Sequence, residues 1–455
     1  MTTIRRPSRL NLNRRQLLAC SGAALLGAGC PALRAVASPG PFNDYRALVC
    51  VFLFGGNDAW NTLVPRSAAE HAVYTDSRQN LALEREVLLP ITPLDGDGVD
   101  YGLHPEMSGL QGLFEQGRLA FVNDVGPLVQ PISLEEYFSG GAPLPPQLFS
   151  HNDQQDQWHT LKGREQLATG WAGRMADLIR TQVAGQRLAT NISLFGNSLF
   201  QAAEDTVAYV MGAGGPLEFI GFDDSGFGLE QRRAFERVVD AEYGSIYERA
   251  FAAVQRRAIS TVDVVTDALA RAPAVSTPFP FSQLGQQMET VARVIAAREE
   301  LEVHRQVFFV AIGGFDTHDD QNELQPGLLG DVSEAMTAFH AATEELGVAE
   351  QVTTFTQSDF GRTLTSNGTG TDHAWSSVQM VLGGAVLGQR FYGNYPLLAL
   401  GGPGDVGGGR FIPSLSSDQY AATLARWFGI EDAALSQVAP NIDNFALRDL
   451  GFLGS

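Results

Sequence analysis

Five short apolar runs most constrain what this chain can fold into. Each run is continuously apolar rather than alternating in polarity. A strand with this pattern is covered on both faces, as the inner strands of a parallel sheet are. The sequence therefore predicts buried parallel strands at "ALVCVFLF" (47–54), "RLAFVND" (118–124), "QVFFVAI" (306–312), "VTTFTQ" (352–357) and "VQMVLGGAV" (378–386).

Segments with helical periodicity separate these runs. Strands that alternate with helices predict a doubly wound α/β fold, with a mostly parallel central sheet and helices on both faces. Right-handed crossovers place the carboxyl ends of the strands along one edge, where the sites of open α/β sheets lie. The Pro- and Gly-rich residues 130–148 and 401–417 are expected to form surface loops. The predicted helices cover residues 104–117, 228–272, 281–304 and 331–346.

The first 37 residues have the pattern of an export signal. A twin arginine at positions 14 and 15 stands directly before an apolar, Gly- and Ala-rich run, and Ala35-Val36-Ala37 offers a small-residue cleavage site. These features predict a twin-arginine signal peptide followed by one α/β domain over residues 38–455. We therefore expect a periplasmic or secreted protein without a permanent membrane span, with the twin-arginine export machinery as a transient partner. The alternative is a basic start to a cytosolic protein.

Cysteine content and charge fit this view. Cys20 and Cys30 lie in the predicted signal, so the mature chain keeps only Cys50, which cannot form an internal disulfide. Cys50 is expected to be a small buried apolar residue. Lipidation of Cys30 is a second reading of the N-terminus, although the residues before it lack the large apolar side chain usually found there. The formal net charge of -20 argues against nucleic acid as a partner.

Three aspartates follow predicted strands within a few residues. Asp58, Asp316 and Asp359 come after the first, third and fourth apolar runs, and the first two are preceded by Gly-Gly, which permits close backbone approach. A single aspartate in such a place is more often a turn or helix N-cap residue. Three carboxylates at one edge of a sheet would repel one another unless a cation joined them, and a divalent metal is the simplest such cation.

Two histidines make this metal prediction more specific. Imidazole nitrogen favours zinc, manganese or iron over pure calcium or magnesium. We therefore expect one or two divalent ions, with zinc or manganese favoured and calcium allowed. Asp372 is expected to orient the imidazole of the neighbouring His373 rather than to bind metal. The predicted ligands are Asp58, Asp316, His318, Asp359 and His373.

Ser150 has two readings. It opens the helix-like stretch "SHNDQQDQW" and can be an ordinary N-cap residue. Alternatively it is a nucleophile, because the helix N-terminus and a metal would both stabilise an alkoxide and an anionic substrate. In that second reading, Arg362 and Asn61 hold the oxygens of the substrate.

Longer motifs resemble those of bacterial exported proteins grouped as the domain of unknown function 1501 family. That family is in turn similar to the alkaline phosphatase and sulfatase superfamily. The resemblance implies a mostly parallel sheet, helices on both faces and a metal centre at the carboxyl edge. The motifs are the twin-arginine start, "VFLFGGNDAWNTLVP", "HPEMSGLQGLFEQGRLAFVNDVG", "SHNDQQDQW", "GGFDTHDDQ" and "SDFGRTLTSNGTGTDHAW".

The resemblance also implies roles for single residues. Phe360 stands where the superfamily pattern has a histidine, which leaves a second ion one ligand short, and His151 is a replacement from another direction. Ser150 in this local motif excludes the formylglycine of sulfatases. The implied ligand sets are Asp316, His318 and His373 for one ion, and Asp58, Asp359 and Ser150 for the other.

These features together predict an exported metal-dependent hydrolase acting on a phosphate or sulfate ester, a small anionic substrate. Whether the chain turns over a substrate is left open by Phe360. The alternative is a catalytically silent exported protein that keeps the fold and an ion and acts as a binding or assembly partner.

Overall fold

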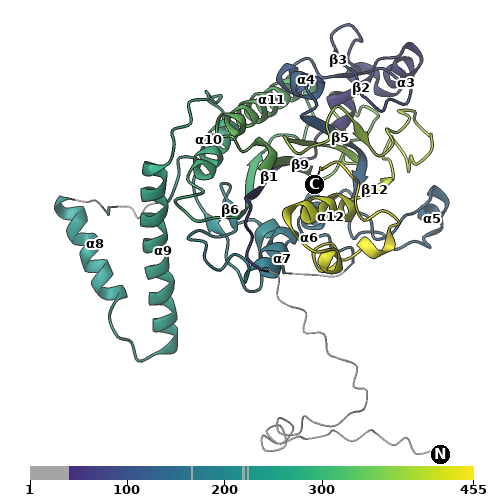
Figure 1. Ribbon diagram of the computed structural model, residues 1–455. Helices are drawn as coiled ribbons and strands as arrows, with labels where there is room; N and C mark the ends of the chain where they lie inside the picture. Colours follow the sequence, from purple (N-terminus) through teal and green to yellow (C-terminus); the bar gives the residue numbers. More distant parts are fainter. Residues whose placement is uncertain (1–39, 165–167, 218–220, 223–224, 455) are drawn as a thin grey trace, which may run out of the picture. The chain divides into compact units, whose positions relative to one another are not determined.

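A nine-stranded mixed sheet lies at the centre of the fold (Figure 1). The computed structural model describes residues 40–164, 168–217, 221–222 and 225–454, so the predicted signal peptide lies outside the described residues. The strand order is β11-β5-β10-β9-β1-β8-β6-β7, with β12 beside β5. The strands are β1 (Arg46–Leu53), β5 (Leu119–Gly126), β6 (Asn191–Ser193), β7 (Tyr209–Val210), β8 (Arg305–Ile312), β9 (Val352–Ser358), β10 (Ser377–Gly383), β11 (Phe391–Tyr392) and β12 (Leu415–Ser416).

The sheet is mostly parallel, as predicted, with β10 as the reversed strand. β1 pairs in parallel with β8 and β9, whereas β10 is antiparallel to both β5 and β9. The prediction of a parallel strand at 378–386 is therefore wrong. The physical reason is the connection, because β9 reaches β10 through a loop without a helix, and a parallel neighbour requires a crossover. The doubly wound detail of the fold stays a prediction.

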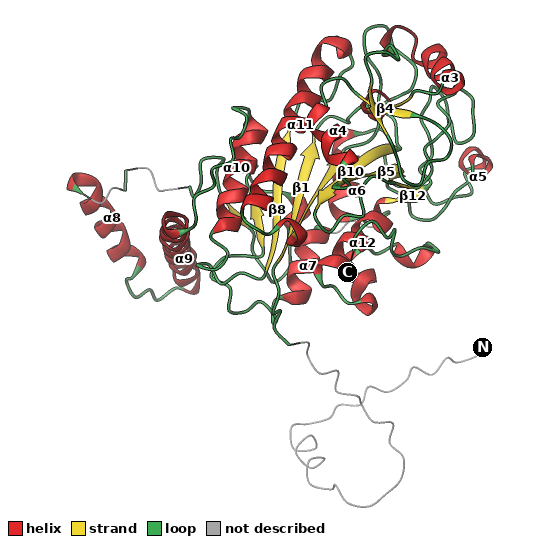
Figure 2. Cartoon of the chain, turned by 45° about the horizontal axis from the view of Figure 1, so that its top comes forward, coloured by secondary structure: helices red, strands yellow, loops and turns green. Residues whose placement is uncertain are grey.

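Both faces of the sheet are buried, which explains the continuous apolar runs. Val49 and Val51 of β1 belong to one hydrophobic cluster, while Cys50 and Phe52 belong to the cluster on the other face. Full burial of each such side chain contributes about 1.5–3 kcal/mol. Helices α4, α10 and α11 cover the first face, and α6, α7 and α12 cover the second (Figure 2). The expectation that Cys50 is a buried apolar residue is confirmed.

The helices follow the predicted periodicity but differ in their bounds. The predicted helix 104–117 begins only at Ser108, because residues before it form a turn. The predicted helix 228–272 is two helices, and the one predicted at 331 begins ten residues earlier. The longer helices are α4 (Ser108–Glu115), α6 (His151–Thr160), α7 (Trp171–Ile179), α8 (Gly226–Val239), α9 (Ile246–Arg271), α10 (Gln283–Ala296), α11 (Gln321–Glu345) and α12 (Ser417–Phe428).

Smaller elements complete the described part of the chain. Helices α8 and α9 pack against each other and extend away from the sheet (Figures 1 and 2). None of the described helices has both the length and the apolar character needed to span a bilayer. The remaining elements include the sheet of β2 (Leu63–Pro65), β3 (Leu89–Ile91) and β4 (Tyr101–Leu103), and the helices α2 (Ala59–Thr62), α3 (Ala68–Arg78), α5 (Leu134–Ser139) and α13 (Leu435–Val438).

The two predicted loops contain short elements. Residues 130–148 include α5, which Ser133 and Glu136 begin with reciprocal capping hydrogen bonds. Residues 401–417 include β12, and Asp405 folds the Gly-rich part of this segment by accepting backbone hydrogen bonds. Both segments reach the functional site described below.

Asp418 is a buried carboxyl group in the first turn of α12. It accepts hydrogen bonds from Asn441 and Ser416, and burial raises its pKa to about 7. A folded-state pKa above the unfolded value means that the folded state binds the proton more tightly. The stabilisation is therefore present at low pH and is lost as pH rises from about 4 to about 7.

We predict that Asp418→Asn removes this pH dependence. Relative to the variant, the free energy of unfolding of the wild type should fall by up to about 4 kcal/mol between pH 4 and 8, since one pKa unit is worth about 1.4 kcal/mol. Urea unfolding at several pH values measures this. Asp267→Asn, on the exposed side of α9, should keep the wild-type slope. Parallel curves for the wild type and Asp418→Asn would contradict the prediction.

Candidate metal centre

Three histidines and one aspartate converge at the carboxyl edge of the sheet. Asp316 Oδ1 lies 3.1 Å from His318 Nε2 and 3.2 Å from His373 Nε2, and its Oδ2 lies 3.3 Å from His151 Nε2. The two Nε2 atoms of His318 and His373 are 2.8 Å apart. His151, Asp316 and His373 form a group whose ligand atoms all lie within 4.8 Å of one another. The cluster thus gathers groups from the end of β8, the start of α6 and the loop after β9.

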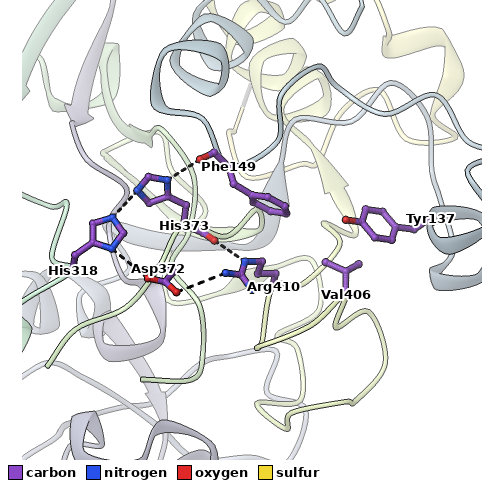
Figure 3. A pocket seen from close by; sticks show the side chains of 7 residues that line it. All are labelled: Tyr137, Phe149, His318, Asp372, His373, Val406 and Arg410. Atoms are coloured by element: carbon purple, nitrogen blue, oxygen red, sulfur yellow. Dashed lines mark hydrogen bonds and ion pairs between the residues drawn. The ribbon is translucent and has the colours of Figure 1, made fainter. Parts of the chain in front are cut away.

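Each histidine is held by its other ring nitrogen. His151 Nδ1 lies 2.7 Å from Asp359 Oδ2. His318 Nδ1 lies 3.3 Å from Asp372 Oδ1, and His373 Nδ1 lies 2.7 Å from the Phe149 carbonyl oxygen; Figure 3 draws these two contacts. Carboxylate and carbonyl oxygens can only accept, so these contacts favour a proton on Nδ1, and a neutral ring in that tautomer presents the lone pair of Nε2. Backbone and carboxylate partners of this kind are typical of metal-binding histidines.

Arg362 fixes the orientation of Asp316. Its Nη1 donates to Asp316 Oδ1 at 2.8 Å and to the Gly55 carbonyl oxygen at 3.2 Å, while its Nε and Nη2 donate to Thr371. Burial opposes ionisation of Asp316, but the hydrogen bond and charge of Arg362 outweigh it and lower the pKa of this carboxyl. Asp316 is therefore a carboxylate at neutral pH, ready to bind a cation.

The pKa values of two of the histidines shift in opposite directions. The hydrogen bond to Asp359 raises the pKa of His151, while burial lowers the pKa of His373. The neutral form of His373, which a metal ligand requires, is thus favoured. Phe360 contributes to this burial, because its ring packs 4.5 Å from the His373 ring and 4.8 Å from the His151 ring, measured between centroids.

Close backbone contacts explain the glycines around the cluster. A side chain on Gly55, which has φ 112°, would begin 2.3 Å from the backbone nitrogen of Asp316. A side chain on Gly370 would meet the Thr317 carbonyl oxygen at 2.2 Å, and one on Gly361 would meet the Ser376 carbonyl oxygen at 1.9 Å. The glycines therefore let the strand ends and the long loop lie against one another, which brings His373 back to Asp316.

Phe149 has an unusual backbone conformation beside the cluster. Its φ of 74° is in the left-handed region, which is rarely populated by bulky residues and costs of order 1–3 kcal/mol. In this conformation its carbonyl oxygen binds His373, while its ring lines the adjoining pocket (Figure 3). One strained residue thus supports both the cluster and the pocket.

The structure brings together three of the five predicted ligands: Asp316, His318 and His373. Asp359 lies beside them but holds His151, and it also accepts from Gln155 and from the Gly55 amide. Its expected role as a ligand is therefore replaced by a positioning role. Asp372, expected to orient His373, contacts His318 instead.

Asp58 is turned into the protein interior. Both Asp58 and Arg78 have fully buried side chains, and Arg78 Nη2 lies 2.5 Å from Asp58 Oδ2. Gln321 and the Trp60 amide supply the other hydrogen bonds to this carboxylate. Among the described residues, none of its hydrogen bonds reaches the three histidines. Arg78 thus supplies the positive charge that the sequence analysis assigned to a second ion.

The two predicted substrate-holding residues are also committed to internal contacts. Asn61 accepts from Tyr74 and Arg78 and donates to the Leu81 carbonyl oxygen, and it is 1% exposed. Arg362 is 0% exposed and holds Asp316 as described above. Neither side chain lines the pocket, because the polar groups of both residues already form hydrogen bonds in the protein interior.

Ser150 is the N-cap residue of α6 but does not cap the helix with its side chain. Its Oγ donates to Asp153 Oδ2 at 2.7 Å. It stands between Phe149, whose carbonyl holds His373, and His151, which contacts Asp316. The backbone thus places Ser150 next to the cluster. Among the described residues, the hydroxyl of Ser150 forms its hydrogen bond with Asp153 and not with a residue of the cluster.

A pocket of about 400 Å³ opens beside the histidines. His318, His373 and Asp372 form one part of its wall, and the sequence analysis found all three. It missed the other part, which consists of Tyr137, Phe149, Val406 and Arg410 (Figure 3). The Pro- and Gly-rich composition of residues 130–148 and 401–417 signalled loops, but nothing in it signalled that both loops meet at this site.

His151, Asp316 and His373 fit a single metal ion, because one ligand atom from each lies within 4.8 Å of the others. Ligand atoms around a tetrahedral zinc with bonds of about 2.0–2.1 Å are about 3.3 Å apart, close to the distances from Asp316 to the three histidines. Two Nε2 lone pairs that face each other at 2.8 Å repel unless a cation or proton lies between them. The side chain of Asp316 is 46% exposed, so the site is open to solvent.

We predict that Arg78→Met is strongly destabilising because it leaves Asp58 charged, buried and unpaired. The free energy of unfolding should fall by about 3–5 kcal/mol, and the double variant Asp58→Asn/Arg78→Met should regain much of this loss. Denaturant unfolding measures both. Arg237→Met, on the exposed surface of α8, is the control. Equal stability of the single and double variants would contradict the role of Arg78 as the counter-ion.

Comparison with known proteins gives one family match. Residues 228–409 match the model described as a protein of unknown function (DUF1501), a stretch that includes Asp316, His318 and His373. No curated protein matches the chain. Similar solved structures include Ps i-CgsB in complex with k-i-k-neocarrahexaose, at 9% identity over 86% of this chain and 73% of that chain, with a TM-score of 0.36. Another is the PsFucS1 sulfatase from Pseudoalteromonas sp., at 7% identity over 86% of this chain and 68% of that chain, also with a TM-score of 0.36. The resemblance to the DUF1501 family is thus confirmed over residues 228–409.

Proposed function

We propose that the chain is an exported metal-dependent hydrolase of phosphate or sulfate esters, on a doubly wound, alkaline phosphatase-like fold. The observation that carries the proposal is the anchoring of three histidines by Nδ1, so that each directs Nε2 toward Asp316. Histidines with a purely structural role would have no reason to direct their Nε2 atoms toward the same carboxylate. The exposure of Asp316 supports a site that a substrate can reach.

One ion would be held by His151, Asp316 and His373, with His318 Nε2 beside them at 2.8 Å from His373 Nε2. Zinc or manganese fits this set of nitrogen and carboxylate ligands best. When bound, such an ion supplies Lewis acidity that stabilises charge on a phosphoryl or sulfuryl oxygen. A second ion is not part of the proposal, because Arg78 neutralises Asp58 and Asp359 is engaged with His151.

Ser150 is the proposed nucleophile. Its hydroxyl would pass its proton to Asp153, with which it already forms a hydrogen bond, as Oγ bonds to the phosphorus or sulfur atom. The ester oxygen would leave, and water would later break the bond to Ser150. The N-terminal amides of α6 would favour the anionic group near this serine.

A second candidate function is supported by Phe360 and Arg78. An aromatic ring beside the histidines and a guanidinium beside Asp58 fit a protein that keeps one ion without turnover and serves as a binding or assembly partner. Both proposals place the mature chain in the periplasm or outside the cell after twin-arginine export, on the strength of residues 1–37. Absence of ester hydrolysis in a metal-loaded protein would favour this second function.

We predict that zinc or manganese binds with one ion per chain and raises the melting temperature. Binding to the folded state alone stabilises by about 2.7 kcal/mol when the free ion is at 100 times its dissociation constant. His373→Ala should lose both effects, while His304→Ala, outside the cluster, should keep them. Metal analysis and thermal unfolding measure this. If the wild type contains no bound ion and its melting temperature does not change on addition of zinc or manganese, the proposal is wrong.

We predict that Ser150→Ala abolishes hydrolysis of chromogenic phosphate or sulfate esters without loss of the ion. The reason is that the hydroxyl acts on the substrate and is absent from the proposed ligand set. Ser139→Ala, in the exposed last turn of α5, is the matched control and should retain wild-type rates. Steady-state rates and metal content are measured together. Undiminished hydrolysis by Ser150→Ala would exclude the serine as nucleophile.

A further inference from the structure

We infer that Arg410 binds the oxygens of the anionic group of the substrate, and that Asp405 positions it. The inference rests on the proposed function, because it names the residue that recognises the ester at the same site. Sequence analysis assigned this role to Arg362 and Asn61, but both are almost fully buried and held in internal hydrogen bonds. Arg410 is a cation that lines the open pocket beside the histidines.

The guanidinium of Arg410 is held at one end and accessible at the other. Its Nε donates to the His373 carbonyl oxygen at 2.9 Å, and its Nη1 donates to the Gly407 carbonyl oxygen at 3.0 Å. Its Nη2 reaches only the outer range of an ion pair, 3.9 Å from Asp372 Oδ2, and the side chain is 29% exposed. Donors on Nη1 and Nη2 are thus left for an incoming oxyanion.

Arg410 is also held by an aromatic ring. Its guanidinium carbon lies 5.5 Å from the centre of the Phe149 ring, a distance at which a cation is attracted by the ring face (Figure 3). Phe149 in turn binds His373 through its carbonyl oxygen. The cation and the metal-binding histidine therefore share a support, so their separation is set by the structure rather than by a flexible side chain.

Asp405 holds the loop that carries Arg410. It accepts backbone hydrogen bonds from Gly401 at 2.8 Å, Gly407 at 2.7 Å, Gly409 at 2.9 Å and Arg410 at 3.2 Å. Asp405 is 7% exposed, and among the described residues its carboxylate forms a hydrogen bond with one pocket residue, through the Arg410 amide. Four backbone N–H groups that bind one carboxylate hold the loop in one conformation. This conformation fixes the position from which the side chain of Arg410 enters the pocket.

The charges of the site make anion binding dependent on the metal. Three carboxylates, Asp316, Asp359 and Asp372, stand against two guanidinium groups, Arg362 and Arg410, which leaves one negative charge when the histidines are neutral. A bound divalent ion would turn this into one positive charge. A tetrahedral oxyanion would then be attracted by the ion on one side and by the planar, fork-like donors of Arg410 on the other.

The test measures anion binding directly, with full-length protein loaded with manganese. Inorganic phosphate and inorganic sulfate are titrated separately by calorimetry, and the manganese content of every variant is measured. Arg410→Gln should keep manganese but bind both anions roughly ten- to hundred-fold more weakly, the range for loss of a charged hydrogen bond. Arg410→Lys should fall in between, because it keeps the charge without the fork.

Asp405→Asn and Arg237→Gln complete the set. Asp405→Asn should weaken anion binding less than Arg410→Gln, and it should raise the KM for a chromogenic ester more than it lowers kcat, because it displaces a binding group. Arg237→Gln, an exposed arginine of α8, should behave as the wild type. The relative affinity for phosphate and sulfate identifies which ester the site favours.

Each outcome separates this inference from the proposed function. A wild type that binds manganese and both anions in an Arg410-dependent manner but hydrolyses no ester supports the inference and overturns the hydrolase. A wild type that binds neither anion overturns the inference, as does unchanged affinity in Arg410→Gln. If Arg410→Gln does not fold, unchanged affinity in Arg410→Lys has the same consequence.

Discussion

The parallel pairing of β1, β8 and β9 is the constraint on which the site depends. Leu53, the last residue of β1, is level with Ile312 of β8 and with Ser358 of β9. Because the three strands end at the same height, the residues that follow them meet at one edge of the sheet. Burial of both faces by helices fixes this register, since a slip of one residue would exchange the two hydrophobic clusters.

The three aspartates at this edge differ in what neutralises them. Asp58 is paired with the buried Arg78, Asp359 with His151, and Asp316 with Arg362 and the partly exposed histidines. Solvent exposure follows the same division, because the first two carboxylates are fully buried and the third is half exposed. One edge of a sheet therefore carries two structural carboxylates and one that is available for chemistry. Their sequence contexts look alike, but their surroundings make them different.

This division also explains how much could be predicted from the sequence. The apolar runs predicted the buried strands, and Asp316, His318 and His373 were identified because strand ends and a His-containing loop are visible locally. The reversed direction of β10 was missed, because the sequence between β9 and β10 does not show whether the connection is a loop or a helical crossover. Asp58 was misjudged because Arg78 is twenty residues away on another helix. Arg410 was missed because a Gly-rich loop gives no sign of where it folds back to.

Phe360 has a consequence for whether this edge of the sheet can hold a second cation. Its ring packs on two of the histidines, and its neighbour Asp359 anchors one of them. Exchange of this phenylalanine for histidine would add a nitrogen ligand next to a carboxylate that is already engaged, while the guanidinium of Arg78 would still occupy the partner position at Asp58. A histidine at position 360 would therefore leave Asp58 neutralised by Arg78, so conversion of this edge into a second cation site requires a change at Arg78 as well.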